Sequence, residues 1–346
     1  MTLVTTVRGP IQAADLGICL THEHVLNDVK SWWHLTESIG IDPEAFAHKP
    51  LGIEDLWDLK HDPFANLDNC RLDDVALAVE EVLRFAALGG RSLIETTVPG
   101  IGRDLRGLQA VSERANIHIV AGTGFYLQSS HPGFVRDKSA QELAEWIITD
   151  IRDGEGGIRP GIIGEIGVSD QFTPDERKSL TAACLAQRET GLPMQVHLPG
   201  WFRSGDEVLD HVEASGVDPA SVVLCHMNPS GDDQSYQQRL AKRGAWIQYD
   251  MIGAELFYAD QGVQCPSDAE NARNIVALME AGHLHRLLLS SDIFLKNLLR
   301  RYGGPGYAHL LQYFVPRLRR LGVSADTIQV LLVTNPRSLF EGKEER

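Results

Sequence analysis

The sequence has little that would suit an extracellular, membrane-spanning or nucleic-acid-binding protein. Its five cysteines are odd in number, lie far apart and form no CxxC pair, which argues against a disulfide framework or a thiolate zinc site and favours a reducing cytoplasm. Basic residues are in deficit, with 32 Lys and Arg against 47 Asp and Glu, and the net charge of -15 disfavours nucleic acid as a partner. No apolar run reaches about 18 residues and no signal-peptide pattern precedes the first strand, so we expect neither a membrane span nor a secretory leader.

A dinucleotide-binding GxGxxG fingerprint and internal repeats are also missing, whereas short apolar runs rich in β-branched residues recur along the chain. Each run is followed by a longer stretch with helical periodicity, which is typical of β-α-β units in a parallel sheet. Eight such units predict an α/β fold closed into a (β/α)8 TIM barrel rather than an open doubly wound sheet. The expected strands are 16–21, 92–97, 117–122, 161–166, 193–197, 221–226, 245–249 and 286–291.

The whole chain, 1–346, is expected to form a single barrel domain, because its hydrophobic content of 43% allows a large buried core. Residues 2–17, with a turn-prone Arg-Gly-Pro, predict a small β-hairpin that covers the bottom of the barrel. A helix over 175–189 is indicated by a Thr-x-x-Glu capping box and a proline in its first turn. Residues 25–70 form an unusually long first βα loop of roughly 45 residues.

Six side chains of metal-binding type follow the predicted strands at their carboxyl ends, where barrel active sites lie. His22 and His24 are two residues apart on an extended chain, so both should point into the barrel mouth, while Glu23 should point the other way. Imidazole and carboxylate groups suit Zn²⁺, Mn²⁺, Co²⁺ or Fe²⁺, and six of them are too many for one tetrahedral zinc. The pattern predicts two divalent cations, with zinc preferred, held by His22, His24, Glu165, His197, His226 and Asp292.

Each of these residues also has a structural interpretation when it is taken alone. A single histidine at a strand end, such as His197 or His226, is more often a hydrogen-bonded structural residue than a ligand. Asp292 could cap the next helix. Glu165 lies in an apolar strand and must find a cation or hydrogen-bond donors, because burial of an unpaired charge is costly. The joint occurrence of all six at corresponding strand ends is what favours the metal site.

The order of the motifs THEH, GEIG, VHLPG, CHMN and SSD resembles the phosphotriesterase branch of the amidohydrolase superfamily, above all the phosphotriesterase-related proteins, and the likeness spans the whole chain. The resemblance implies that the more buried metal is bound by the two histidines of the first strand and by the aspartate of the eighth. It further implies that the histidines of strands five and six bind the more exposed metal and that Glu165 bridges the two.

The chain departs from this family's pattern at three positions. Many members use a carboxylated lysine as the bridge where this chain has Glu165, which carries the same charge on a shorter arm. Pro229 stands where the paraoxon-hydrolysing members carry an acidic residue, so their proton-shuttling pair is not reproduced. Tyr126 matches a tyrosine that lactonase relatives place beside the exposed metal, but their second tyrosine is Gln128 here. Packing under the long first loop is the alternative role for Tyr126.

The predicted function is binuclear metal-dependent hydrolysis of a small molecule, in which a metal-bridging hydroxide attacks the carbonyl of a carboxylic ester, lactone or amide. Asp292 would accept the proton of the hydroxide and pass it to the leaving group. Phosphotriester hydrolysis is the main alternative. A barrel that binds a metal or another ligand without turnover, and a metal-free structural barrel, are the alternatives from other classes.

Substrate specificity is expected to come from the βα loops, because the metal ligands determine only the class of reaction. Tyr126, Arg203 and Lys296 are the predicted substrate-binding residues, and Arg301 and Asp250 are further charged candidates. Each of these charged residues could instead lie on a solvated surface. If the basic ones face the pocket, an anionic ester, lactone or amide becomes the favoured substrate. The sequence leaves monomer and homodimer open.

Overall fold

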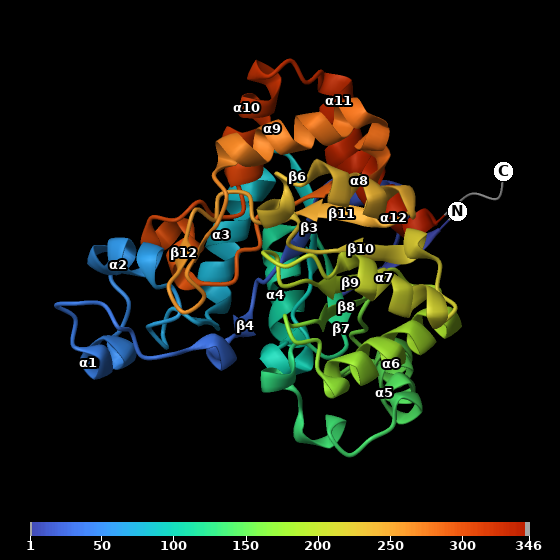
Figure 1. Ribbon diagram of the computed structural model, residues 1–346, viewed down its shortest axis with the longest axis horizontal. Helices are drawn as coiled ribbons and strands as arrows, with labels where there is room; N and C mark the ends of the chain where they lie inside the picture. Colours follow the sequence, from blue (N-terminus) through green and yellow to red (C-terminus); the bar gives the residue numbers. More distant parts are fainter. Residues whose placement is uncertain (1, 343–346) are drawn as a thin grey trace.

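Eight parallel strands form a nearly closed barrel that organises the structure (Figure 1). The computed structural model describes residues 2–342. Every barrel strand overlaps one of the eight predicted runs, so the (β/α)8 fold is confirmed. In hydrogen-bonded order the strands are β3 (Ile18–Glu23), β6 (Gly90–Glu95), β7 (His118–Thr123), β8 (Ile162–Gly167), β9 (Met194–His197), β10 (Val222–Leu224), β11 (Trp246–Tyr249) and β14 (Leu287–Leu289).

The barrel closes between β3 and β14, the two ends of the sheet, through contacts that involve side chains. The Thr21 hydroxyl donates to the Leu289 carbonyl at 3.1 Å, and the Ser290 hydroxyl accepts from the His22 amide at 3.0 Å. Above them the Asp292 amide donates to the His22 carbonyl at 3.3 Å. The seam therefore brings a predicted metal ligand from the first strand next to one from the eighth.

Helices surround the barrel, and their ends follow the local sequence signals (Figure 1). The predicted capping box is present, because the Thr173 hydroxyl accepts from the Glu176 amide at 3.3 Å and the Glu176 carboxylate accepts from the Thr173 amide at 3.0 Å. The helices are α1 (Pro43–His48), α2 (Leu56–His61), α3 (Val75–Ala87), α4 (Leu105–Ala115), α5 (Ala140–Asp153), α6 (Pro174–Thr190), α7 (Gly205–Ala214), α8 (Gln234–Lys242), α9 (Asp268–Leu278), α10 (Val315–Arg320), α11 (Ala325–Gln329) and α12 (Asn335–Glu341).

The predicted N-terminal hairpin is present and closes the amino end of the barrel. Its strands β1 (Leu3–Thr6) and β2 (Gly9–Gln12) pair antiparallel. Val4 is buried in one cluster with inward-facing barrel residues such as Val120. Gly161, directly before β8, allows this close approach, since a Cβ there would lie 2.1 Å from the Thr5 carbonyl oxygen. With the amino end filled by side chains, the carboxyl end is left for the site.

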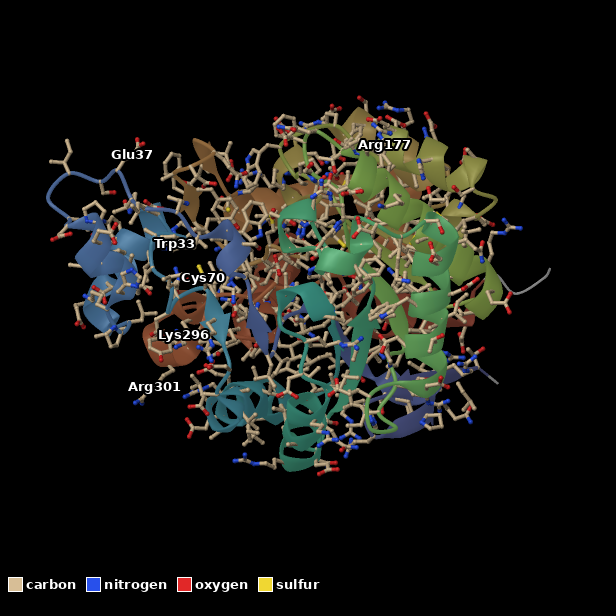
Figure 2. All side chains as sticks on the ribbon, turned by 90° about the horizontal axis from the view of Figure 1, so that it is seen from below. Trp33, Glu37, Cys70, Arg177, Lys296 and Arg301 are labelled. Carbon is tan, nitrogen blue, oxygen red and sulfur yellow. The ribbon has the colours of Figure 1, made fainter. Side chains whose placement is uncertain are left out.

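The long first loop forms a wall beside the carboxyl end of the barrel. It contains α1, α2 and β4 (Asn27–Asp28), which pairs with β5 (Arg71–Leu72). The side chain of Asn69 accepts from the Asn297 amide at 2.8 Å, and Lys296 pairs with Asp68. Figure 2 shows Lys296 beside this loop, close to Cys70. The loop is thus held against the segment that follows β14.

Within residues 2–342, no helix combines the length and the apolar character that crossing a bilayer needs.

Candidate metal centre

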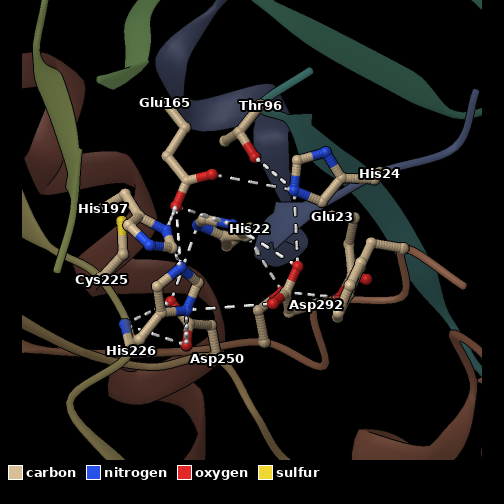
Figure 3. Close-up of polar contacts among 12 residues, drawn as sticks. His22, Glu23, His24, Thr96, Glu165, His197, Cys225, His226, Asp250 and Asp292 are labelled. Atoms are coloured by element: carbon tan, nitrogen blue, oxygen red, sulfur yellow. Dashed lines mark hydrogen bonds and ion pairs between the residues drawn. The ribbon is translucent and has the colours of Figure 1, made fainter. Parts of the chain in front are cut away.

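The six predicted ligands converge at the carboxyl end of the barrel, as Figure 3 shows. Their side chains are buried, apart from a small exposed part of His197. Two overlapping sets of three have ligand atoms within 4.8 Å of one another, and both contain His22. One set adds His24 and Asp292, and the other adds Glu165 and His226. The strand-end pattern in the sequence therefore corresponds to one compact cluster in space.

The first set consists of two imidazoles that face one carboxylate. Asp292 Oδ1 lies 3.6 Å from His22 Nε2 and 3.4 Å from His24 Nε2. Within residues 2–342, His22 Nε2 and Asp292 Oδ1 are buried and have no hydrogen-bond partner. Buried polar atoms without partners are rare and costly, and an imidazole nitrogen facing a carboxylate oxygen is a typical pair of ligands for a divalent cation. These atoms therefore fit a metal ion between them.

The second set is centred on Glu165. Its Oε1 lies 2.8 Å from His226 Nε2, 3.1 Å from His197 Nδ1 and 3.7 Å from His22 Nε2. Its other oxygen, Oε2, lies 4.0 Å from His24 Nε2. One carboxylate thus faces histidines of both sets, which is the position that a bridging ligand requires.

The pKa values in the cluster are perturbed by burial and by mutual contact. Burial alone would raise the pKa of Glu165, but the imidazoles of His22, His197 and His226 outweigh it and hold the pKa well below its usual value. Burial, together with the nearby carboxylates, raises the pKa of Asp292 well above the usual value for aspartate. Such opposite shifts in two adjacent carboxyl groups are typical of functional sites.

A layer of polar side chains behind the ligands determines the orientation of the imidazole rings. His22 Nδ1 donates to the Gln195 side-chain oxygen at 2.9 Å. His24 Nδ1 donates to the Thr97 hydroxyl at 2.8 Å, which in turn donates to Glu95 at 2.6 Å. These bonds leave the Nε2 atoms of both rings facing the cluster, His22 Nε2 without a hydrogen-bond partner among the described residues and His24 Nε2 with only the Thr96 hydroxyl, at 3.4 Å, as suits histidine ligands. The sequence did not indicate Gln195 or Glu95, because neither lies at a strand end that carries a ligand.

Two of the predicted ligands have left-handed backbone conformations, and a buried acid supports each of them. His226 has φ 57° and Asp292 has φ 48°, values that side-chain-bearing residues rarely adopt. The His226 amide and its Nδ1 both donate to Asp250, at 3.0–3.1 Å. Around Asp292, the flanking backbone amides of residues 291 and 293 donate to Glu23 at 2.9 Å. Asp250 and Glu23 thus hold the backbone on which these ligands stand.

Glu23 was expected to point away from the site, and its side chain does turn aside from the metal ligands, but toward the β3–β14 seam rather than toward solvent. It is fully buried, and burial raises its pKa to about 7 although the Ile293 amide and the Ser290 hydroxyl donate to it. Simple strand alternation gives the face but cannot show that the segment after β14 covers that face. Glu23 is therefore a positioning residue for Asp292.

Replacing Glu23 with glutamine is expected to lower activity by about 10- to 100-fold, the usual effect of losing a partner that orients metal ligands. Glutamine has one acceptor oxygen, so one of the buried amides beside Asp292 loses its partner. The comparison is with Glu145→Gln, at an exposed position of α5. Steady-state kinetics and melting temperature are measured for both variants. Equal activity of the two would show that Glu23 does not position Asp292.

The cluster lies at the base of a cavity of 480 Å³. Tyr126 lines this cavity, and its hydroxyl lies 3.3 Å from His197 Nδ1. Gly167, at the end of β8, permits this placement, because a Cβ there would lie 2.2 Å from the Tyr126 carbonyl carbon. Tyr126 therefore borders the cavity beside His197, whose Nδ1 also faces Glu165.

The other predicted substrate-binding residues do not line the cavity. Arg203 faces Asp232 and Asp233, with nitrogen–oxygen distances of 3.5 and 3.4 Å. Lys296 pairs with Asp68 of the long loop, so its role in the structure is to hold that loop. Figure 2 shows Arg301 on the outside of the molecule.

Asp250 is also not a cavity residue. Its side chain is buried behind His226 and does not border the open space. The basic residues that the sequence suggested for binding an anionic substrate therefore do not line the cavity.

Fold and site together define a barrel hydrolase whose candidate metal-binding side chains lie at the carboxyl ends of the strands. The chain belongs to the phosphotriesterase family, whose family model matches residues 2–340, and it is a hydrolase of that family. An N-acetyltaurine hydrolase of Xenopus tropicalis is 32% identical, with 96% of both chains covered. A phosphotriesterase-related protein of Nematostella vectensis is also 32% identical, with 97% of both covered.

Solved structures of similar proteins share this barrel fold. A resiniferatoxin-binding protein from Rhodobacter sphaeroides superposes with a TM-score of 0.95 at 49% identity, covering 98% of this chain and 95% of that one. The phosphotriesterase homology protein from Escherichia coli, solved with phosphate in its active site, has a TM-score of 0.78 at 30% identity, with 94% and 99% covered. A lactonase from Listeria monocytogenes shares the fold, with a TM-score of 0.79 at 20% identity, covering 99% and 100%.

Proposed function

We propose that this protein is a binuclear metal-dependent hydrolase that cleaves a carboxylic ester, lactone or amide. The observation that carries the proposal is the pair of buried, unpartnered ligand atoms, His22 Nε2 and Asp292 Oδ1, next to a carboxylate that faces histidines of both sets. Relatives named as hydrolases of an N-acetyl compound support carbonyl chemistry.

The ligands divide naturally between two cations. His22, His24 and Asp292 would hold the more buried one, His197 and His226 the other, and Glu165 would contact both. Divalent cations at such a site supply Lewis acidity and lower the pKa of a bound water to about 7. Nitrogen and oxygen donors of this kind suit Zn²⁺ first, and Mn²⁺, Co²⁺ or Fe²⁺ as alternatives.

The residues of the chain itself would bind the substrate and move the proton. Asp292 takes a proton from the attacking water with its other carboxylate oxygen, the one that would not hold the metal, as the new carbon–oxygen bond forms, and gives it to the leaving oxygen or nitrogen as the scissile bond breaks. Asp250 and Glu23 keep His226 and Asp292 in place during this transfer. The Tyr126 hydroxyl, which lies 3.3 Å from His197 Nδ1, would donate to the substrate carbonyl oxygen.

Phosphotriester hydrolysis is the second candidate. It is favoured by one observation, the phosphate in the active site of the 30% identical Escherichia coli relative. The absence of an acidic residue at Pro229 stands against it as the main activity.

The experiment is a substrate panel with and without metal. The protein is treated with a chelator, reloaded with Zn²⁺ or Mn²⁺, and assayed on lactones, aryl esters, N-acyl amides and paraoxon. We expect turnover of carbonyl substrates that is lost on chelation and restored by metal. Faster turnover of paraoxon than of every carbonyl substrate would select the second candidate. Metal binding without turnover of any substrate would support a binding protein instead.

A further inference from the structure

The cavity above the cluster has an unusual charge composition. Among the described residues that line it, none is Lys or Arg. Its charged side chains are the ligands Glu165 and Asp292 at the base and the exposed Asp170 and Asp260 farther out. Arg203 and Lys296, the basic residues that the sequence suggested for this site, are paired with acids outside the cavity. An anionic group of a substrate would therefore find no counter-charge from a side chain in this space.

Part of the remaining lining is a connected aromatic wall. Trp32 and Phe64 of the long first loop stack at 5.5 Å between ring centroids, and Phe64 lies 5.1 Å from Tyr258. Tyr258 meets Trp201, which follows β9, edge to face at 5.5 Å. The wall begins near the site, where Trp32 lies 6.5 Å from His197. Three separate loops thus contribute one continuous apolar surface beside the reacting groups.

Much of this wall is rigidly supported. Phe64 is buried, and it belongs to the stretch of the first loop that is held to the segment after β14 by Asn69 and Asn297. Tyr258 lies in β12 (Phe257–Tyr258), which pairs with β13 (Val263–Gln264) in the loop after β11. A pre-formed aromatic surface binds flat or edge-on rings without the entropy cost of ordering a loop.

We propose that the site selects uncharged substrates with a bulky apolar group beside the scissile carbonyl and discriminates against carboxylate- and sulfonate-bearing ones. This inference rests on the proposed function for its reaction and adds the substrate class. The proposed cations would lie among the ligands at the base, so an anionic group held farther out in the cavity loses its water without gaining a cationic side chain, and Asp170 and Asp260 repel it on entry. An apolar ring instead gains contact with the wall formed by Trp32, Phe64, Tyr258 and Trp201.

The test compares two ketones that cannot be hydrolysed, 2-acetylnaphthalene and its 6-sulfonate, by calorimetric titration of the Zn²⁺-loaded protein. We expect the uncharged ketone to bind at least about tenfold more tightly. The corresponding esters, 2-naphthyl acetate and its 6-sulfonate, should differ in kcat/KM in the same direction. Equal or tighter binding of the sulfonate would overturn the inference, and so would failure of both ketones to bind.

Measuring both binding and turnover separates the proposed selectivity from the proposed hydrolase function. If the uncharged ketone binds preferentially while neither ester is hydrolysed, the selectivity stands and the proposed hydrolase function fails. If both esters are hydrolysed but the ketones bind equally, the function stands and the selectivity fails.

Two variants test the named residues, each with a matched control. Asp260→Arg should reduce the preference for the uncharged ketone, whereas Glu145→Arg on the exposed face of α5 should leave it unchanged. Trp201→Ala should weaken binding of the uncharged ketone by about fivefold or more, and Trp57→Ala, at a 69% exposed tryptophan outside the cavity, should not. If Asp260→Arg leaves the preference unchanged, the assignment of charge repulsion to Asp260 is wrong. If Trp201→Ala leaves the affinity for the uncharged ketone unchanged, the assignment of aromatic contact to Trp201 is wrong.

Discussion

Replacing Asp292 with asparagine is expected to lower kcat by about 1,000-fold, within the range that a positioned general acid–base contributes. The substitution keeps the size of the side chain but removes its charge and its capacity to carry a proton. Asp292 Oδ1 faces both His22 and His24 and has no hydrogen-bond partner within residues 2–342, so no neighbouring group replaces it. KM should change little, because the proposed role concerns proton transfer and not substrate binding.

Kinetics and elemental analysis on the same sample distinguish the two roles of Asp292. A lower kcat at full metal content supports the role of Asp292 in proton transfer. A parallel loss of kcat and of bound metal supports a role of Asp292 as a metal ligand alone. The control is Asp326→Asn at an exposed position of α11, which should retain full activity. An Asp292→Asn enzyme that keeps its metal and its turnover would contradict the mechanism.

Replacing Glu165 with glutamine is expected to reduce the metal content from two ions per chain to one or fewer. The Glu165 carboxylate lies among the nitrogens of His22, His197 and His226, and a neutral amide cannot balance two dications there. Activity should fall by more than about 100-fold, since the substitution removes a direct ligand and not only a supporting partner.

Folding must be shown to survive this substitution. Circular dichroism of the metal-free Glu165→Gln protein should match that of the metal-free parent, because the barrel core lies below the cluster. The exposed Glu145→Gln variant serves as the control and should bind two ions. Two tightly bound ions in Glu165→Gln would show that Glu165 is not the bridge.

Sequence periodicity was sufficient to predict the strands and the cluster. The convergence of these side chains could be predicted because the carboxyl ends of parallel barrel strands meet at one edge, so that residues as distant as His24 and Asp292 become neighbours. Strand alternation gave the face to which Glu23 points but not its burial, since that burial depends on the segment after β14 crossing this face.

Loop residues were less predictable for a physical reason. Lys296 and Arg203 were expected at the cavity because they follow strands, but each pairs with an acid from a different part of the chain. The partner of Lys296 is Asp68, 228 residues away in sequence. Such pairings arise from the packing of one loop against another, and no periodic pattern encodes them.

Metal titration of the chelated protein tests the central claim most directly. Chelated protein is titrated with Zn²⁺ while turnover of the best carbonyl substrate and the bound metal per chain are measured together. We predict negligible turnover without metal and a rise that saturates when two ions are bound per chain. Full turnover in protein that contains no metal would contradict the account, and saturation at one ion per chain would contradict its binuclear site.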